Sequence, residues 1–366
     1  MKVVVLTGGT SAEREICLKS GTKVMAALDP ARYDAAAVDL AEITGQRAAD
    51  LAGALMSPQG YDPKALAAVT SGGREATGRD PGPSRALAEE ARPDGCLAEK
   101  PAGGPDVVFI ALHGGAGENG TVQGMLDLFG IPYVGSGVLA SAMALNKIIA
   151  KKLFEREGIP TPEWVPLRAS ERGSAGAQVL SQVGLPCVVK PASEGSSIGV
   201  TIVREQEQLE PALDLAFQYG REALAERFIS GIEITGPVLG NDDPQMLPLI
   251  EIVPSREFYD YEAKYTPGAT EEIVPARIPE AQAVRARELT LAAHRALGCR
   301  GMSRVDMIVA SDEVYVLELQ TIPGLTDTSL LPRAAEAAGI SFPRLVDRLI
   351  ELALEERGSD GTRRAL

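Results

Sequence analysis

The sequence predicts a chain of mixed class, with a parallel α/β domain over residues 1–145 followed by two smaller α+β units. The first domain is indicated by the opening MKVVVLTGG, in which a short apolar run reaches two glycines and an amphipathic stretch follows. Strand, turn and helix in this order are typical of the start of a parallel α/β domain. The later units are indicated by a change in the spacing of strands and helices after the linker Pro160-Thr161-Pro162. A third observation is the alternation of polar and apolar residues over 301–320, which predicts a β-hairpin.

The first domain is expected to continue its opening strand with a helix capped by Thr10 or Ser11. Its further elements are predicted to be strands at 35–40, 106–113 and 131–134 and a helix at 121–129, and a helix at 138–157 leads to the linker. Residues 41–104 lose this pattern and are rich in Ala, Gly, Pro and Arg, so we interpret part of them as a variable surface insertion without chemistry.

The two later units are predicted at 146–230 and 231–357, with a tail at 358–366. The central unit is expected to contain strands at 187–190, 199–203 and 224–229 and a helix at 205–219. The last unit is expected to contain strands at 232–239 and 246–253, a loop at 255–270, a helix at 279–297, the hairpin 301–320 and a closing helix at 340–356.

Composition narrows the class of protein. The chain has 366 residues, of which 45% are hydrophobic and 23% charged, which is ordinary usage for a globular protein of several domains. A net charge of −14 argues against binding to nucleic acid or to an anionic membrane. The apolar run at 3–6 is too short for a signal peptide, so we expect a cytoplasmic protein. The four cysteines lack the spacing of a zinc site or a disulfide framework and are expected to be small buried residues.

The predicted hairpin has one polar face. If residues 311–313 form its loop, Asp306 lies opposite Glu318 and Arg304 lies opposite Gln320. Facing carboxylates repel each other, whereas a Mg²⁺ ion binds carboxylate and amide oxygens. We therefore interpret this face as a magnesium site, with Arg304 placed to stabilise a developing oxyanion. The other side chains, expected to face the core, are Val305, Met307, Val309, Tyr315, Leu317 and Leu319.

A solvated polar face is the ordinary alternative for an amphipathic hairpin. It is disfavoured here because the rigid loop Thr321-Ile322-Pro323-Gly324 follows at once.

The segment KPASEGSSIGV at 190–200 connects two predicted strands and can turn several backbone N–H groups toward one anion. Lys190, the first residue of the segment, places a positive charge beside this turn, which suggests a phosphate site. The segment lacks the ending of the Walker loop and precedes no helix, so it is a different kind of nucleotide site. Alone, such a turn is more often structural; together with the hairpin, it favours a nucleotide held with Mg²⁺.

These segments belong to a longer set of motifs that resembles one family. The chain resembles the D-alanine–D-alanine ligases of the ATP-grasp superfamily, from residue 1 to about 355 apart from the insertion. The motifs are GGTSAERE at 8–15, LHGGAGENGTVQG at 112–124, GIPYVGSGVLASA at 130–142, KPASEGSSIGV at 190–200, YDYEAKY at 259–265, SRVD at 303–306 and LELQTIPGLTDTS at 317–329. The resemblance implies a Rossmann-like first domain followed by a two-part ATP-grasp fold.

The implied reaction joins two D-alanines for peptidoglycan synthesis through an acyl phosphate, with ATP as the phosphoryl donor. By the resemblance, the ATP contacts are Lys147 and Lys190 at the α- and β-phosphates, Lys264 at the γ-phosphate, Glu194 and Ser197 in the glycine-serine loop, Glu226 and Ile229 at the adenine, and Glu233 at the ribose. Two Mg²⁺ ions, or Mn²⁺ in their place, would be held by Asp306, Glu318 and Gln320.

The resemblance also implies roles at the amino acid site. Arg304 and the backbone N–H of Gly324 would stabilise the oxyanion, and Tyr265 would join Glu13 and Ser196 in a network when loop 255–270 closes as a lid. The residues implied to bind the amino acids are Glu13 at the first ammonium, His113 near a carboxylate, and Ser329 and Leu330 at the second D-alanine. Tyrosine rather than phenylalanine at 265 favours dipeptide over depsipeptide formation.

Taken singly, several of these residues have ordinary structural interpretations. Glu13 would pair with a helix dipole, His113 would be a satisfied structural histidine, and Ser329 would cap a helix. His294, in a predicted surface helix, has only a structural interpretation.

The chain departs from the family pattern at three positions. Gln320 stands where Asn is usual, and its extra methylene moves the amide oxygen that a tight Mg²⁺ octahedron would need. Asn119 and Asn146 replace acidic residues, and we interpret both as drift.

Two alternative functions stay open. One is an ATP-grasp ligase with another acceptor, such as a different D-amino acid, a D-hydroxy acid or an L-amino acid pair. The other is a catalytically silent nucleotide-binding paralogue, suggested by Gln320. The expected partners are D-alanine and ATP, and the resemblance allows a homodimer.

Overall fold

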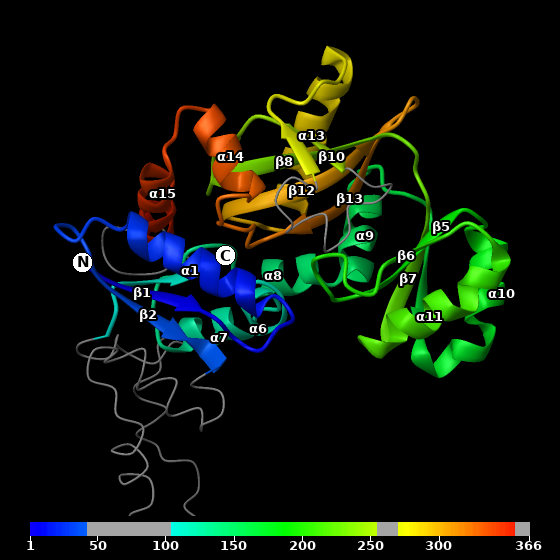
Figure 1. The fold of residues 1–366 in the computed structure, drawn as a ribbon, viewed down its shortest axis with the longest axis horizontal. Helices are drawn as coiled ribbons and strands as arrows, with labels where there is room; N and C mark the ends of the chain where they lie inside the picture. Colours follow the sequence, from blue (N-terminus) through cyan, green and yellow to red (C-terminus); the bar gives the residue numbers. More distant parts are fainter. Residues whose placement is uncertain (42–103, 255–269, 356–366) are drawn as a thin grey trace, which may run out of the picture.

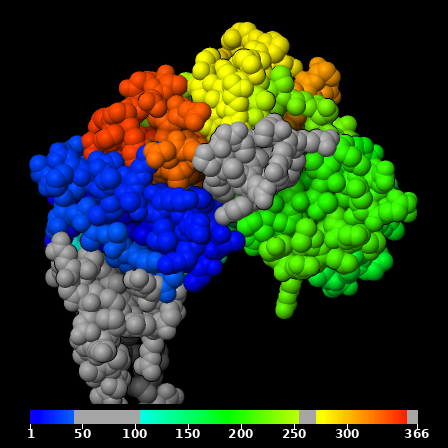
Figure 2. All heavy atoms as spheres, viewed as in Figure 1, coloured from blue at the N-terminus to red at the C-terminus, as the bar shows by residue number. Residues whose placement is uncertain are grey.

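The computed structural model describes residues 1–41, 104–254 and 270–355. They form three units, each built around its own sheet (Figure 1). The central unit forms a lobe beside the other two, green against the blue first domain and the yellow and orange last unit (Figure 2). In the described ranges, no helix combines the length and apolarity needed to cross a bilayer.

The first domain has a parallel sheet of order β2-β1-β3. Its strands are β1 (Lys2–Thr7), β2 (Asp34–Asp39) and β3 (Val107–Ile110). The valines of β1 and β3 are buried, as expected for a parallel sheet that is covered on both faces. The helices α1 (Arg14–Ala27), α6 (Gly115–Glu118) and α7 (Thr121–Leu128) follow the strands.

The fourth strand expected at 131–134 is absent from the described sheet, where this segment makes one isolated parallel bridge between Val108 and Tyr133. The amide of Val108 donates to the carbonyl of Pro132, and the amide of Val134 donates back to Val108. Pro132 has no amide hydrogen with which to extend the ladder.

The helix expected at 138–157 is two helices, α8 (Val138–Leu145) and α9 (Lys147–Arg156). They are separated by Asn146, whose backbone is extended with ψ of 96°. The Asn146 side-chain oxygen accepts from the amides of Ile148 at 3.1 Å and Ile149 at 3.2 Å and so caps α9. This break makes Lys147 the first residue of α9. Asn and Asp cap helices about equally well. The cap therefore accounts for an Asn at position 146, where the family pattern has an acidic residue.

The central unit has a four-stranded antiparallel sheet of order β4-β7-β5-β6, covered by α10 (Arg172–Gln182) and α11 (Leu209–Gln218). The strands are β4 (Trp164–Arg168), β5 (Cys187–Pro191), β6 (Thr201–Val203) and β7 (Glu222–Arg227), and two short 3₁₀ turns lie at Ala169–Glu171 and Gln206–Gln208. Neither β4 nor α10 was predicted from the sequence.

The last unit has a six-stranded sheet of order β11-β10-β8-β12-β13, with β9 paired to β8. Its strands are β8 (Ile232–Gly240), β9 (Gln245–Met246), β10 (Ile250–Pro254), β11 (Thr270–Ile273), β12 (Gly301–Val309) and β13 (Val314–Gln320). Its helices are α13 (Glu280–Ala296), α14 (Leu330–Ala337) and α15 (Phe342–Glu355).

The predicted hairpin β12–β13 forms with the expected pairs Asp306 opposite Glu318 and Arg304 opposite Gln320. The register then shifts, so that Met307 pairs with Val316 and Leu317 is an extra residue on β13. Val314 and Val316 are therefore buried, whereas Tyr315 and Leu317 are only partly covered. The prediction that Tyr315 and Leu317 face the core was wrong because alternation alone does not reveal a bulge; the other four predicted core residues of the hairpin are buried.

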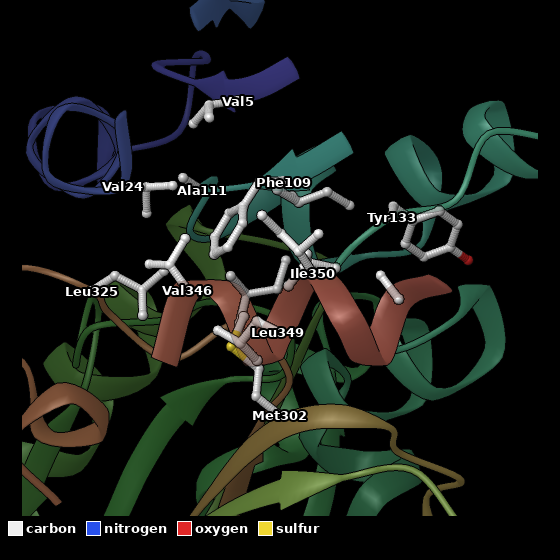
Figure 3. Close-up of a cluster of buried hydrophobic side chains, with 14 of the residues drawn as sticks. Val5, Val24, Phe109, Ala111, Tyr133, Met302, Leu325, Val346, Leu349 and Ile350 are labelled. Carbon is white, nitrogen blue, oxygen red and sulfur yellow. The ribbon is translucent and has the colours of Figure 1, made fainter. Parts of the chain in front are cut away.

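One hydrophobic core joins the first domain to the last unit. Helix α15 packs between them, with Val346 and Ile350 on the side of Phe109 and Leu349 on the side of Met302 (Figure 3).

The expectation that His294 lies on a helix surface was wrong: it is 1% exposed and faces β12, where its Nδ1 lies 2.7 Å from the Ser303 hydroxyl. Cys17, Cys187 and Cys299 are buried and free, and Cys96 lies outside the described residues.

The cap of α9 gives a stability prediction. Replacing Asn146 with Ala removes two hydrogen bonds and should lower the free energy of unfolding by about 1 kcal/mol. Asn146→Asp is the matched control and should leave it nearly unchanged. Denaturant unfolding measures both, and equal stabilities for Asn146→Ala and Asn146→Asp would contradict a capping role.

Candidate active site

Two adjoining cavities lie where the three units meet. The larger, of about 620 Å³, lies between the β5–β6 loop, the end of β7 and the last unit's sheet. The smaller lies toward the first domain, between the start of α1, the end of β3 and the loop after β13. The residues Lys147, Glu194, Gly195 and Glu318 line both cavities, so the two spaces meet at these side chains.

Every predicted site residue in the described ranges lines one of these cavities. The larger is lined by Lys190, Ser197, Glu226, Ile229, Glu233 and Asp306. The smaller is lined by Glu13, His113, Ser196, Arg304, Gln320, Gly324, Ser329 and Leu330. Lys264 and Tyr265 lie outside the described residues.

The glycine-serine loop joins the antiparallel strands β5 and β6, as predicted. Ser196 and Ser197 have φ of 48° and 59°, a left-handed backbone that is uncommon for residues other than glycine. The Ser196 hydroxyl donates a short hydrogen bond to Oε1 of Glu13, which connects the loop to the first domain. This contact holds the loop against the site in a conformation that its own sequence disfavours.

The Glu13 carboxylate lies in a space kept open by two glycines. A Cβ atom on Gly114 would lie 2.8 Å from Glu13 Oε2, and one on Gly195 would lie 2.9 Å from the same atom. Glu13 itself is 7% exposed. Gly114 and Gly195 come from different units, so the pocket for this carboxylate exists only when the units are assembled.

Helix α1 begins later than predicted, with Glu13 rather than Thr10 or Ser11 at the N-cap position. Ser11 instead bridges two segments, because its hydroxyl donates to the carbonyl of His113 at 2.7 Å and accepts from the amide of Glu13 at 3.3 Å. The turn before it is held by Asp39, whose Oδ1 accepts from the amide of Gly9 and from Arg14. The hydrogen bonds from Arg14 lower the pKa of Asp39.

His113 is buried at the end of β3, with Nδ1 3.1 Å from the carbonyl of Ile322 and Nε2 3.0 Å from the Ser20 hydroxyl. A carbonyl only accepts, so Nδ1 carries the proton and donates to Ile322. Burial lowers the pKa of His113 and favours the neutral ring. The imidazole therefore orders the loop after β13 rather than supplying a positive charge.

The polar face of the hairpin contains paired charges. Arg304 donates to both oxygens of Asp306 at 2.9 Å, and the Thr235 hydroxyl donates to Asp306 Oδ1 at 2.6 Å. Lys147 Nζ lies 3.4 Å from Glu318 Oε2. Each carboxylate thus has a side-chain cation beside it. With the amide of Gln320 on the same face, these oxygens form a donor set that suits Mg²⁺.

Lys147 also donates to the carbonyl of Glu194 at 2.5 Å, so it connects α9 to the glycine-serine loop. Burial raises the pKa of Glu194. In the larger cavity, Lys190 donates a short hydrogen bond to Glu226 Oε1. Burial acts to raise the pKa of Glu226, but Lys151 and Lys190 outweigh it and the pKa is lowered.

The loop after β13 contributes the far wall of the smaller cavity. The Ser329 hydroxyl accepts from the amide of Thr326 at 2.9 Å, and Ser329 precedes α14, whose first residue is Leu330. A Cβ on Gly324 would lie 2.6 Å from this hydroxyl. Glycine at 324 therefore allows the loop to approach Ser329 closely. Gly324 and Arg304 line the same cavity, as the oxyanion interpretation requires.

Sequence reasoning missed three polar residues of this region: Lys151, Glu118 and Thr235. Burial raises the pKa of Glu118 to about 8, and its Oε2 accepts from the amide of Gly114 at 2.6 Å. Lys151 is fully buried. Its spacing of four from Lys147 on one helix was an available signal, since such residues share a helix face.

The side-chain oxygen of Asn119 accepts from the amide of Thr121 at 2.9 Å, a local cap that either Asn or Asp can supply.

Comparison with known proteins decides the family. Residues 2–136 match the model of the D-ala D-ala ligase N-terminus, and residues 153–351 match that of the C-terminus. The chain belongs to the D-alanine–D-alanine ligase family. It is 45% identical over 358 residues to the D-alanine–D-alanine ligase of Syntrophobacter fumaroxidans, covering 97% of this chain and 98% of that protein.

Solved ligase structures have the same fold. The ligase of Bacillus anthracis complexed with ATP has a TM-score of 0.72 and 31% identity, covering 97% of this chain and 98% of that one. The VanG D-Ala:D-Ser ligase of Enterococcus faecalis has a TM-score of 0.72 and 30% identity, covering 96% and 99%. The predicted fold, an α/β domain followed by a two-part ATP-grasp fold, is confirmed for this member of the D-alanine–D-alanine ligase family.

The contact between Gly195 and Glu13 gives a prediction that separates folding from activity. The methyl group of Gly195→Ala would lie 2.9 Å from Glu13 Oε2, so the Glu13 carboxylate must move. Because a small misplacement of a group in an active site lowers the rate strongly, turnover should fall by about 10- to 100-fold. The free energy of unfolding should change little, because the displaced group is the end of a flexible side chain. Ligase assays and denaturant unfolding measure the two effects.

Gly173→Ala is the matched control, since a Cβ at Gly173 in α10 meets nothing within 4 Å. It should preserve both activity and stability. Full activity in Gly195→Ala would show that the position of the Glu13 carboxylate does not matter.

Proposed function

We propose that this chain joins two D-alanines to D-alanyl-D-alanine at the expense of ATP. The observation that carries the proposal is the meeting of the two cavities at Lys147 and Glu318. A phosphoryl donor in the larger cavity and amino acids in the smaller one would react at this junction. The dipeptide would supply peptidoglycan synthesis, and the need for ATP is consistent with the cytoplasm as the place of reaction.

The larger cavity suits ATP in size and offers lysines to its phosphates. Its volume of about 620 Å³ falls within the usual range for small-molecule sites. Lys147 and Lys190 would contact the α- and β-phosphates, and the glycine-serine loop contacts Lys147 through Glu194 and the first domain through Ser196. Glu226 and the backbone at Ile229 would bind the adenine, Glu233 would bind the ribose, and Glu194 and Ser197 would complete the phosphate contacts.

In the first step, the carboxylate of one D-alanine attacks the γ-phosphorus of ATP, and ADP leaves as an acyl phosphate forms. Glu13 would hold the ammonium of this D-alanine, which fits a buried carboxylate between Gly114 and Gly195. The neutral His113 keeps the Ile322 carbonyl in place beside it.

In the second step, the amine of the second D-alanine attacks the activated carbonyl carbon, and phosphate leaves after a tetrahedral intermediate. Arg304 and the backbone N–H of Gly324 would stabilise the oxyanion, and Ser329 and Leu330 would bind the second D-alanine. The roles of Lys264 and Tyr265, and the closure of loop 255–270, stay predictions.

Two Mg²⁺ ions, or Mn²⁺ in their place, would be held by Asp306, Glu318 and Gln320. Bound there, they would neutralise charge on the phosphate oxygens. The ion pairs from Arg304 and Lys147 to these carboxylates support the proposal, because they mark positions where a cation is favoured.

A phosphate-release assay with D-alanine, ATP and Mg²⁺, combined with mass detection of the dipeptide, tests the proposal. We expect both products with D-alanine alone. Product only with D-serine or a D-hydroxy acid would replace it with the alternative acceptor, a relevant case because the similar VanG protein is a D-Ala:D-Ser ligase. ATP binding without turnover would identify a silent paralogue. A homodimer stays a prediction.

Gln320 gives a separate prediction about the metal. Asn at this position shortens the side chain by one methylene, so Gln320→Asn should maintain or raise turnover and lower the Mg²⁺ concentration needed for half-maximal rate. A titration of rate against Mg²⁺ measures both quantities. A large loss of turnover would show instead that the surrounding site has adapted to the longer ligand.

A further inference from the structure

A second buried lysine lies behind the larger cavity. Lys151 follows Lys147 by one turn of α9 and is fully buried. Its Nζ lies 2.7 Å from Glu226 Oε2 and donates to the Thr161 hydroxyl at 2.5 Å. It lines neither cavity, so it has no contact of its own with what they hold.

Glu226 therefore shares its charge between two lysines. One carboxylate oxygen accepts from Lys190, which lines the larger cavity, and the other faces Lys151. All three side chains are less than one-tenth exposed, at 7% for Lys190, 4% for Glu226 and 0% for Lys151. Burial lowers the pKa of Lys151 to about 8, and the carboxylates of Glu226 and of exposed Glu155 act in the opposite direction. With both lysines protonated, the three groups carry one net positive charge.

The excess charge matters at Lys190. If Glu226 had Lys190 as its one partner, the two would form a neutral pair and a phosphate would compete with a full carboxylate for the ammonium. With Lys151 on the other oxygen, part of the Glu226 charge is already neutralised. The three groups together then present one positive charge at the Lys190 ammonium, and charges in a buried site are weakly screened.

Stability alone does not require this arrangement. A buried ion pair replaced by apolar residues often leaves stability unchanged or raised. A methionine at 151 would leave a balanced Lys190–Glu226 pair, so a second buried lysine needs another reason.

We infer that Lys151 is a positioning residue for the nucleotide: by neutralising Glu226, it leaves the Lys190 ammonium available to the phosphates. This inference rests on the proposed function. It gives Lys151 a larger effect on phosphate binding than on binding of the base, which Glu226 would also contact.

The test compares ADP with adenosine by calorimetry, and the ratio Kd(adenosine)/Kd(ADP) measures the contribution of the phosphates. Lys151→Met should reduce this ratio about ten-fold, equivalent to about 1.4 kcal/mol. Thr161→Val, which removes the hydrogen-bond partner of Lys151 but no charge, is the matched control and should keep the ratio. The double variant Lys151→Met/Glu226→Gln restores one net positive charge and should recover the ratio, even if adenosine binds more weakly.

The outcomes separate this inference from the proposed function. Absence of ADP binding by the unaltered chain would contradict the proposed function itself. Normal ADP binding with an unchanged ratio in Lys151→Met, or an equal loss for ADP and adenosine, would overturn the inference. If Lys151→Met does not fold, the double variant decides, because a folded double variant that lacks the phosphate preference would also overturn it.

Discussion

The site depends on holding charged side chains from three units close together and away from water. Arg304, Asp306 and Lys190 are each less than one-tenth exposed, although such residues are rarely buried unless paired. Their positions come from rigid elements: Lys190 from β5, Arg304 and Asp306 from β12, and Lys147 from the first turn of α9. A shared core under α15 keeps the first domain fixed against the last unit, so Glu13 and His113 face the hairpin in a defined arrangement.

Without ligands, most charged side chains of the site are paired with one another. Arg304 pairs with Asp306, Lys147 pairs with Glu318, and Lys190 shares Glu226 with Lys151. These pairs lower the cost of burying charge, and each has one partner that a nucleotide or a cation could take over. A triphosphate with Mg²⁺ brings both signs of charge at once, so lysines and carboxylates can exchange partners without leaving a charge unpaired. On the proposed function, such an exchange would let a buried site stay folded when empty and still bind highly charged ligands.

Much of the fold and site could be predicted from the sequence because their signals are local. The alternation in 301–320 was enough to place Asp306 opposite Glu318, and the apolar run at 3–6 was enough to place β1. What could not be predicted depended on tertiary contacts. The bulge at Leu317 changes the direction of Tyr315 without a mark in the pattern, and the cap at Asn146 divides a stretch whose periodicity is continuous. His294 looked like a surface residue because only the packing of α13 against β12 reveals its partner, Ser303. Lys151 was missed because its partner Glu226 is far away in the sequence.

On the proposed function, the hairpin and the glycine-serine loop hold one nucleotide between them. A crystal structure with a non-hydrolysable ATP analogue, Mg²⁺ and D-alanine would show whether they do. We expect a triphosphate that contacts Lys147 and Lys190 on one side and, through the metal, Asp306 and Glu318 on the other, with D-alanine beside Glu13. A nucleotide bound elsewhere, or metal and phosphates in separate cavities, would contradict it.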